Sequence, residues 1–283
     1  MTKNIVFATC LAQPAFQASD AVAARALEGR GGVVTAAAWN GDQATFEKAD
    51  AIVIRSTWDY QKTPGAFAGW LQALDDGRPV FNSPALVRAN MSKRYLLDLA
   101  DKGAPLAPTC WVEPDAGAIL AAMNEMGLEE AVVKPEFGAT GSGLSLVRRA
   151  DEAGLAAAAA KMGMPGLVQA LVPEIAANGE TSFMFIGGEF THAVTKRPKS
   201  GEIRCQAEYG GTSELAAPPD WAIAEARRLL GLIPGAPLYA RVDGVVLDGA
   251  MRLMEVELIE PELFFTYAPD AALRFADALM ERL

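Results

Sequence analysis

Several carboxylates stand inside an apolar segment near the C-terminus, between Met254 and Pro261. Side chains alternate between the two faces of a strand, so Glu255 and Glu257 share one face. Two neighbouring carboxylates in a core are costly unless a cation lies between them. Their oxygens suit Mg²⁺ or Mn²⁺, and Mg²⁺ with few protein ligands is typical of sites that bind a nucleoside triphosphate. Glu260, beyond the apolar run, is predicted to be structural or to face a substrate.

A second pair of charges precedes this segment. Arg241 and Asp243 lie two residues apart in an otherwise apolar strand, so both belong to one face. The sequence Asp248-Gly249 is a two-residue hairpin signal that pairs this strand with the one carrying Glu255 and Glu257. We therefore expect the three acids to converge, with Arg241 alongside to hold a phosphoryl oxygen.

Residues 136–143 form a glycine-rich segment between two predicted strands. A P-loop leads from a strand into a helix and carries Gly-Lys-Ser/Thr, which is absent here. The segment can fold its backbone N–H groups over phosphates, although a mobile turn explains the glycines equally well. Lys134 ends the preceding strand at the mouth of this loop, where phosphate is its natural counter-ion. Lys93 falls in a predicted amphipathic helix, where a lysine is usually a solvated surface charge.

The elements around these residues predict a mixed α/β and α+β fold. Residues 1–82 alternate apolar strands with helices, the βαβ pattern of a parallel sheet. One helix is predicted from Ser83-Pro84 through Lys93 to Gly103, and residues 83–108 connect the first domain to the rest. Two further α+β lobes are predicted at 109–171 and 172–283, the second with hairpins at Gly187-Gly188 and Asp248-Gly249.

Composition excludes several functions. A net charge of −10 and a pI near 4.8 argue against nucleic acid or an anionic membrane surface as the main partner. The three cysteines are widely spaced, which indicates reduced thiols of a cytoplasmic protein. His192 is the single histidine, which rules out a Ser-His-Asp triad and a multi-histidine metal site, and its strand-like surroundings favour a structural role. The first apolar run, residues 5–12, is read as a core strand rather than a signal peptide, and no apolar stretch has membrane-spanning length.

The order of these parts resembles the ATP-grasp superfamily of carboxylate-amine ligases over roughly residues 82–265. The parts are a lysine in a helix, a lysine ending a strand, a glycine hairpin, an apolar linker strand, and then Arg-x-Asp and Glu-x-Glu on a hairpin. The resemblance implies an N-terminal parallel-sheet domain followed by two lobes that clamp ATP. Segments 55–60 and 256–265 look closest to a subgroup that includes the O-ureido-serine cyclo-ligase of cycloserine biosynthesis. Glu257 departs from the common Glu-x-Asn motif, which leaves the number of metal ions open.

Carried over position by position, the resemblance implies three groups of site residues. Those expected to contact ATP are Lys93, Lys134, Phe137, Gly138, Thr140, Gly141, Ser142, Gly143, Gln169, Ala170, Leu171 and Glu180. Those expected to face the γ-phosphate and the acceptor are Lys196, Arg204 and Arg241, and the expected metal ligands are Asp243, Glu255 and Glu257.

A possible substrate contact comes from the first domain, where segment 55–60 follows a strand of the parallel sheet. Ligands bind at the carboxyl ends of such strands, so Arg55 is a candidate partner for a substrate carboxylate. Ser56, Thr57 and Asp59 would then orient an amine or hydroxyl. A loop with a helix cap and a packed Trp58 is an equally good interpretation.

The function implied by the resemblance is ATP-dependent ligation with Mg²⁺ or Mn²⁺. The γ-phosphoryl group would pass to a carboxylate or carboxamide-like oxygen of a small amino-acid-like substrate, and an amine would attack the acylphosphate. Two alternatives remain: a non-catalytic ATP-binding protein and a small-molecule kinase. A homodimer would be consistent with the resemblance.

Overall fold

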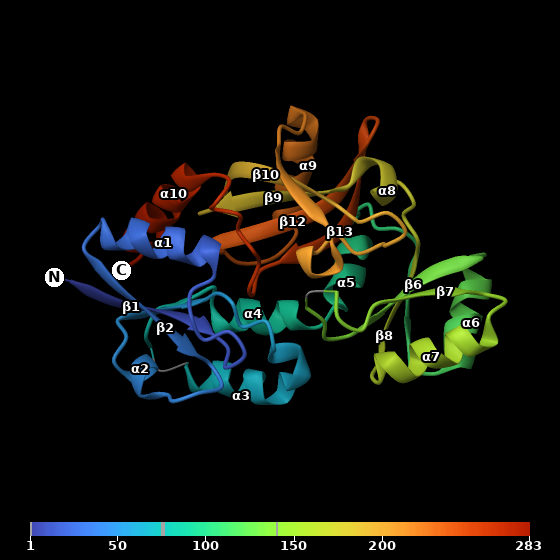
Figure 1. Cartoon of the computed structure of the whole chain (residues 1–283), viewed down its shortest axis with the longest axis horizontal. Helices are drawn as coiled ribbons and strands as arrows, with labels where there is room; N and C mark the ends of the chain where they lie inside the picture. The colour runs from blue at the N-terminus through green and yellow to red at the C-terminus, as the bar shows by residue number, and fades with distance from the viewer. Residues whose placement is uncertain (1, 75–76, 140) are drawn as a thin grey trace.

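The structure is a computed structural model that describes residues 2–74, 77–139 and 141–283. Within these residues the chain forms three β-sheets, which follow one another along the sequence (Figure 1). None of the described helices combines the length and the apolar character that crossing a bilayer requires.

The N-terminal sheet is parallel, with strand order β2-β1-β3-β4. Strands β1 and β3 are almost wholly buried, because elements on both faces of the sheet cover them. The predicted βαβ pattern is confirmed, whereas the short α2 and the 3₁₀ helix η1 were not predicted. The elements are β1 (Lys3–Thr9), α1 (Ala18–Glu28), β2 (Gly32–Ala38), α2 (Ala44–Glu47), β3 (Ala51–Ile54), η1 (Tyr60–Lys62), α3 (Pro64–Ala73) and β4 (Val80–Phe81).

The connecting helix differs from its prediction. It begins as expected at Pro84, with the Ser83 hydroxyl accepting a hydrogen bond from the Leu86 N–H. The single helix predicted to reach Gly103 is wrong, because the chain forms α4 (Pro84–Met91) and α5 (Tyr95–Asp101) with a break between them. In the break, the Lys93 N–H donates to the Glu136 carbonyl at 2.9 Å. This bond to the glycine-rich segment replaces a helical one, so Lys93 does not lie on an amphipathic helix.

The central sheet is antiparallel, with strand order β5-β8-β6-β7. Helices α6 and α7 pack against it and against each other, and their side-chain cluster contains no residue from the other two sheets. Asp115 and Asp151 cap the two helices, because each side chain accepts a hydrogen bond from a backbone N–H of the first turn. The elements are β5 (Thr109–Val112), α6 (Ala116–Glu125), β6 (Glu130–Pro135), β7 (Ser145–Arg148), α7 (Glu152–Met162) and β8 (Gly166–Ala170).

The C-terminal sheet is also antiparallel, with strand order β11-β10-β9-β12-β13. Both predicted hairpins are confirmed, whereas α8, η2 and the edge strand β11 were not predicted. The elements are α8 (Ile175–Asn178), β9 (Glu180–Ile186), β10 (Glu189–Arg197), η2 (Ala207–Tyr209), β11 (Thr212–Ala216), α9 (Asp220–Leu230), β12 (Tyr239–Leu247), β13 (Ala250–Glu257) and α10 (Pro269–Met280).

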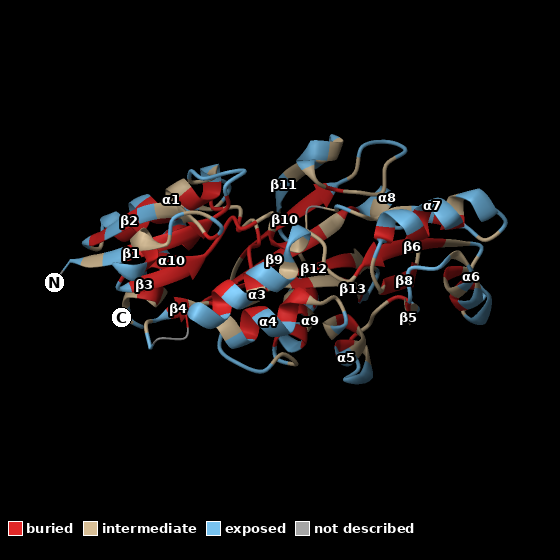
Figure 2. Cartoon of the chain, turned by 90° about the horizontal axis from the view of Figure 1, so that it is seen from below, coloured by how far each residue is buried: buried red, intermediate tan, exposed pale blue. Residues whose placement is uncertain are grey.

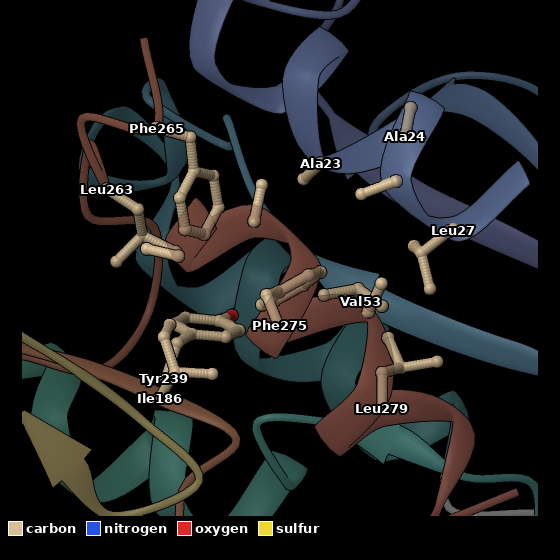
Figure 3. Close-up of a cluster of buried hydrophobic side chains, with 14 of the residues drawn as sticks. Ala23, Ala24, Leu27, Val53, Ile186, Tyr239, Leu263, Phe265, Phe275 and Leu279 are labelled. Carbon is tan, nitrogen blue, oxygen red and sulfur yellow. The ribbon is translucent and has the colours of Figure 1, made fainter. Parts of the chain in front are cut away.

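A shared core joins the N-terminal and C-terminal sheets. Phe275 and Leu279 of α10 pack with Val53, Leu27 and Tyr239, so residues from both ends of the chain meet in one cluster (Figure 3). Buried residues follow the strands, and exposed residues occupy the outer sides of the helices (Figure 2). The central sheet, with its separate core, lies at the end of the molecule away from the two termini (Figure 1).

Candidate active site

A cavity of about 350 Å³ lies where the central sheet meets the C-terminal sheet. Its walls come from strands β6 and β8 of the central sheet, from β12 and β13 of the C-terminal sheet, and from the glycine-rich segment and residues 203–208. The size is within the range of small-molecule sites.

Most of the predicted site residues line this cavity: Lys93, Lys134, Gly138, Gly141, Ser142, Gln169, Ala170, Leu171, Glu180, Lys196, Arg204, Arg241, Asp243, Glu255 and Glu257. The structure thus brings together residues that are up to 164 positions apart in sequence. Those that do not line it are Phe137, Gly143, Arg55, Ser56, Thr57 and Asp59. Thr140 lies outside the described residues.

The predicted acids meet on the β12–β13 hairpin, and each is paired with a cation. Asp243 lies opposite Glu255 and Arg241 opposite Glu257 in the strand register. Arg241 donates to Glu257 at 2.6 Å and to Asp243 at 2.9 Å. Lys93 donates to Glu255 at 2.6 Å. The interrupted helix is what places Lys93 here.

Lys196 ties the carboxylates of two neighbouring strands together. It donates to Asp243 at 3.0 Å and to Glu180 at 2.9 Å. Asp243 also accepts from the Ser182 hydroxyl at 2.7 Å. Burial opposes ionisation of Asp243, but Arg241 and Lys196 outweigh it and lower its pKa. Asp243 is therefore a fixed anion, and its side chain is only 2% exposed.

Where the charged cluster faces the cavity, carboxylates outnumber the lysine and arginine side chains that pair with them. Burial raises the pKa of Glu257 to about 7 despite its bond to Arg241, and Asp243 and Glu255 add to the effect. Burial and the Glu257 carboxylate raise the pKa of Glu260 to about 8. A raised pKa means that ionisation of these groups lacks compensation, so the cavity favours an additional cation.

A divalent cation fits two of the three predicted ligands best. The side chains of Glu255 and Glu257 are 25% and 28% exposed, whereas Asp243 is enclosed by its two cations. Among the described residues, no three His, Cys, Asp or Glu side chains form a ready-made metal site. Ligands beyond the two glutamates would therefore come from phosphate oxygens and water, as is common for Mg²⁺.

Lys134 is the cation best placed for an incoming anion. Its side chain is 6% exposed, and its Nζ forms no hydrogen bond or ion pair with any residue the structure describes. Burial lowers its pKa, and Lys93 acts in the same direction, whereas the Glu255 and Glu180 carboxylates oppose the shift. A buried ammonium beside a cavity, with no direct ion pair among the described residues, is suited to a phosphate group.

The glycine-rich segment borders the same space. Gly141 and Gly143 have φ of 68° and 78°, the left-handed region that favours glycine. A Cβ on Gly143 would lie 2.7 Å from Cγ of Pro135, so glycine is also required by space. A Cβ on Gly141 would meet the side chains of Gln206 and Arg204, which shows how closely two cavity-lining loops approach.

Comparison with known proteins identifies the family. Residues 5–82 match the family model "D-cycloserine synthetase DcsG, N-terminal domain", and residues 101–228 match "prokaryotic glutathione synthetase, ATP-grasp domain". The cycloserine biosynthesis protein DcsG of Streptomyces lavendulae is 30% identical over 263 residues, which cover 87% of each chain. The chain belongs to the ATP-grasp ligase family. Glutathione synthetase of Prochlorococcus marinus (strain MIT 9313) is 33% identical over 138 residues, 48% of this chain and 42% of that one.

Solved structures agree with the assignment. The crystal structure of D-cycloserine synthetase DcsG superposes with a TM-score of 0.81 at 27% identity and covers 99% of each chain. D-alanine–D-alanine ligase of Bacillus anthracis in complex with ATP gives 0.70 at 15% identity, covering 99% of this chain and 96% of that one, which supports the fold alone. The resemblance drawn from the sequence is confirmed, and the chain is an ATP-dependent ligase of the kind that forms carbon–nitrogen bonds.

Within this ATP-grasp ligase, the predicted substrate contacts Arg55, Ser56, Thr57 and Asp59 do not line the cavity. Arg55 is 2% exposed, pairs with Asp20 at 2.8 Å and stacks over the ring of Tyr239. Its pKa is raised, because Asp20 and its other neighbours outweigh the opposing effect of burial. Asp59 accepts hydrogen bonds from Trp39 and an asparagine at 2.7 and 2.9 Å.

Ser56 and Thr57 are fully buried behind the cavity wall, and their hydroxyls have no hydrogen-bond partner among the described residues. From the same stretch of chain, Trp58 and Tyr60 line the cavity instead. The segment chosen by the strand-end rule thus reaches the cavity through aromatic side chains and not through the four predicted residues.

The lining also includes residues that the sequence did not identify as part of the site. Tyr60, Asn90 and Tyr95 all line the cavity. Asn90 bridges the Val256 carbonyl and the Leu258 N–H at 2.9 Å each, which ties α4 to the end of the acidic strand. An asparagine on the apolar face of a helix was the available signal, since a buried amide needs such partners.

Proposed function

We propose that this ATP-grasp ligase phosphorylates a carboxylate, or a ureido or carboxamide-like oxygen, of a small amino-acid-type substrate. The oxygen attacks the γ-phosphorus of ATP, and ADP leaves. An amine then attacks the acylphosphate carbon, phosphate leaves, and an amide or a ring forms. The observation that carries the proposal is that Lys134, which has no ion pair among the described residues, and the partly exposed Glu255 and Glu257 converge on one cavity.

The nucleotide would lie against the central sheet. Lys134 and Lys93 supply positive charge for the phosphates, and Gly138, Ala139, Gly141 and Ser142 line the cavity from the hairpin. The end of β8, at Gln169 to Leu171, offers backbone groups to the adenine edge. Glu180 stands next along the wall and is suited to accept hydrogen bonds from ribose hydroxyls.

Glu255 and Glu257 would hold Mg²⁺ or Mn²⁺, for the reasons of exposure and charge given above. A bound divalent cation would draw phosphate oxygens together and screen their charge. Arg241 touches both Glu257 and Asp243, so the protein fixes the direction of its guanidinium before any ligand binds. Lys196 and Arg204 line the same wall and would stabilise the charge that develops as the phosphoryl group moves.

The chain's own residues supply position and charge rather than a covalent nucleophile. Burial raises the pKa of the cavity-lining Cys205 thiol to about 12, so it is protonated and unreactive at neutral pH. The single histidine lies outside the lining, with its ring bonded to backbone and to Thr191. Phosphoryl transfer needs mainly orientation and electrostatic stabilisation, which the paired charges provide.

The test is an ADP-release screen with mass detection of products. The panel contains amino acids, ureido and hydroxamate amino acids, dipeptides and polyamines, each with ATP and Mg²⁺. The relatives named for cycloserine biosynthesis make ring closure of a ureido amino acid the first reaction to examine. We expect substrate-dependent ADP together with a product that has lost water overall.

Either of two outcomes would contradict the ligase proposal and indicate another function. A phosphorylated product with no new amide or ring would indicate a small-molecule kinase. ATP binding with no substrate that stimulates ADP release would indicate a non-catalytic nucleotide-binding protein. The control variant is Lys48→Met, an exposed lysine outside the cavity, which should match the wild type.

A further inference from the structure

The segment from Leu258 to Leu263 follows the acidic strand and has no regular secondary structure. Each of its six successive backbone carbonyls nevertheless lies within hydrogen-bond distance of a different side-chain donor. In chain order, the donors and distances are Asn82 Nδ2 at 2.8 Å, Tyr239 Oη at 2.9 Å, Trp58 Nε1 at 2.8 Å, Arg55 Nη2 at 2.8 Å, Arg241 Nη1 at 3.2 Å and His192 Nε2 at 2.9 Å.

These donors come from the two parts of the molecule that meet at the segment 258–263, the N-terminal domain and the C-terminal sheet. Arg55, Trp58 and Asn82 belong to the N-terminal domain, and the other donors belong to the C-terminal sheet. Because side chains from distant parts of the chain hold each peptide, we infer that the segment is rigid before ligand binds. We call it the held segment. It explains the burial of Arg55 and places Glu260 at a fixed point of the cavity wall.

Glu260 differs from the four acids of the paired cluster that line the same cavity. Its relative exposure is 9%, and it lines the cavity. Glu180, Asp243, Glu255 and Glu257 all pair with lysine or arginine. No lysine, arginine or histidine of the described chain forms an ion pair with Glu260. Burial and the Glu257 carboxylate raise its pKa by more than Lys93 and Arg241 lower it.

The surroundings of Glu260 distinguish an organic cation from a metal ion. Trp58 bonds the Glu260 carbonyl, and both Trp58 and Tyr60 line the cavity beside it. Ile259 adds an apolar surface. Aromatic and aliphatic neighbours suit an alkylammonium group, whose carbon atoms need apolar contact and whose charge is attracted by ring faces. Mg²⁺ retains water and prefers a shell of oxygen ligands, so the aromatic and aliphatic side chains of this wall suit it less than they suit an alkylammonium group.

We propose that Glu260, together with Trp58 and Tyr60, binds the ammonium group of the substrate. The inference rests on the proposed ligase function and names its substrate class: amino acids with a free, protonated amine. One N–H of that ammonium would donate to the Glu260 carboxylate, and the rings would cover the adjoining carbon. The held segment would fix the distance between the amine and the end of the substrate that receives phosphate.

Binding calorimetry tests this without requiring turnover. The full chain is titrated with O-ureidoserine, D-alanine and L-serine, and with the N-acetyl derivative of each, in the presence of Mg²⁺ and a non-hydrolysable ATP analogue. For the wild type we expect at least one free amine to bind about tenfold or more tightly than its N-acetyl form, the scale of one charged hydrogen bond. Glu260→Gln should remove most of that preference, and Glu260→Asp should restore part of it.

The control variant is Glu113→Gln, an exposed glutamate outside the cavity, which should keep the wild-type preference. Three outcomes would overturn the inference: no free amine binds to the wild type, the N-acetyl forms bind as tightly, or Glu260→Gln keeps the preference. Loss of ATP-analogue binding in Glu260→Gln would also overturn it by assigning Glu260 to the nucleotide site. The ligase proposal fails separately, when ADP forms without an amide or ring.

Discussion

Replacing Lys134 by methionine should weaken ATP binding without weakening the fold. The Lys134 ammonium lies on the cavity wall and has no hydrogen bond or ion pair with any other described residue. Methionine keeps much of the length of the side chain and removes the charge. A hydrogen bond from a charged group to phosphate contributes about 1.5–3 kcal/mol, so the dissociation constant of ATP should rise about 10- to 150-fold.

The same substitution should stabilise the fold, although it weakens ATP binding. Burial lowers the pKa of Lys134 in the folded state, so the unfolded chain holds this proton more tightly. The charge therefore destabilises the fold at pH values below the folded-state pKa, and the penalty disappears as pH rises to the unfolded value of about 10.4. At pH 7.5 the variant should be more stable than the wild type by about 1 kcal/mol.

Two measurements on the same samples check this. ATP affinity is measured by calorimetry, and the free energy of unfolding by urea titration without nucleotide. Lys48→Met, which removes an exposed lysine, should change neither. A lower urea midpoint with unchanged ATP affinity would refute the reasoning, because it would make Lys134 a structural residue.

Four further predictions follow from the same contacts. Glu257→Gln should abolish ADP formation at saturating ATP, and retained turnover would remove Glu257 from the metal site. Glu260→Gln should raise the free energy of unfolding at pH 8 by about 1–3 kcal/mol but change it little at pH 4. The reason is that a carboxyl group with a raised pKa in the folded state destabilises the fold only above its unfolded-state pKa. Equal shifts of the urea midpoint at both pH values would contradict this. Burial lowers the pKa of His192, so the free energy of unfolding of the wild type should fall as pH drops below about 6.5. Urea titrations at pH 5 and 8 should show a difference of about 1 kcal/mol from this group in the wild type, and none in His192→Gln. Gly143→Ala should destabilise the fold by about 1 kcal/mol or more, since its Cβ meets Pro135 at positive φ; an unchanged melting temperature would refute the required glycine.

The sequence predicted the elements whose signals are local. Alternation of apolar residues gave the strands, and Gly187-Gly188 and Asp248-Gly249 gave the hairpins. The break before α5 was not predictable, because its cause is a bond from Lys93 to the carbonyl of Glu136, a residue 43 positions away. A pattern within 20 residues carries no information about such a partner.

The same distinction applies to the site. The acids of the β12–β13 hairpin were predictable, because strand alternation and a two-residue turn fix which side chains share a face. The partner of Arg55 was not, since Asp20 lies in a helix 35 residues earlier. Arg55 carries the charge that a substrate carboxylate would need, but the fold directs it to Asp20 and to the held segment.

Glu257 occupies the position where asparagine is common in the family, and the structure shows how the additional charge is accommodated. Arg241 donates to Glu257 at 2.6 Å while it also binds Asp243, so one guanidinium faces two carboxylates. Arg241 and Lys196 together outweigh burial at Asp243, whose pKa falls, but burial prevails at Glu257, whose pKa rises to about 7. Burial therefore disfavours the ionised form of Glu257, and a bound cation would favour it. The glutamate thus makes cation affinity depend on pH, which an asparagine at this position would not do.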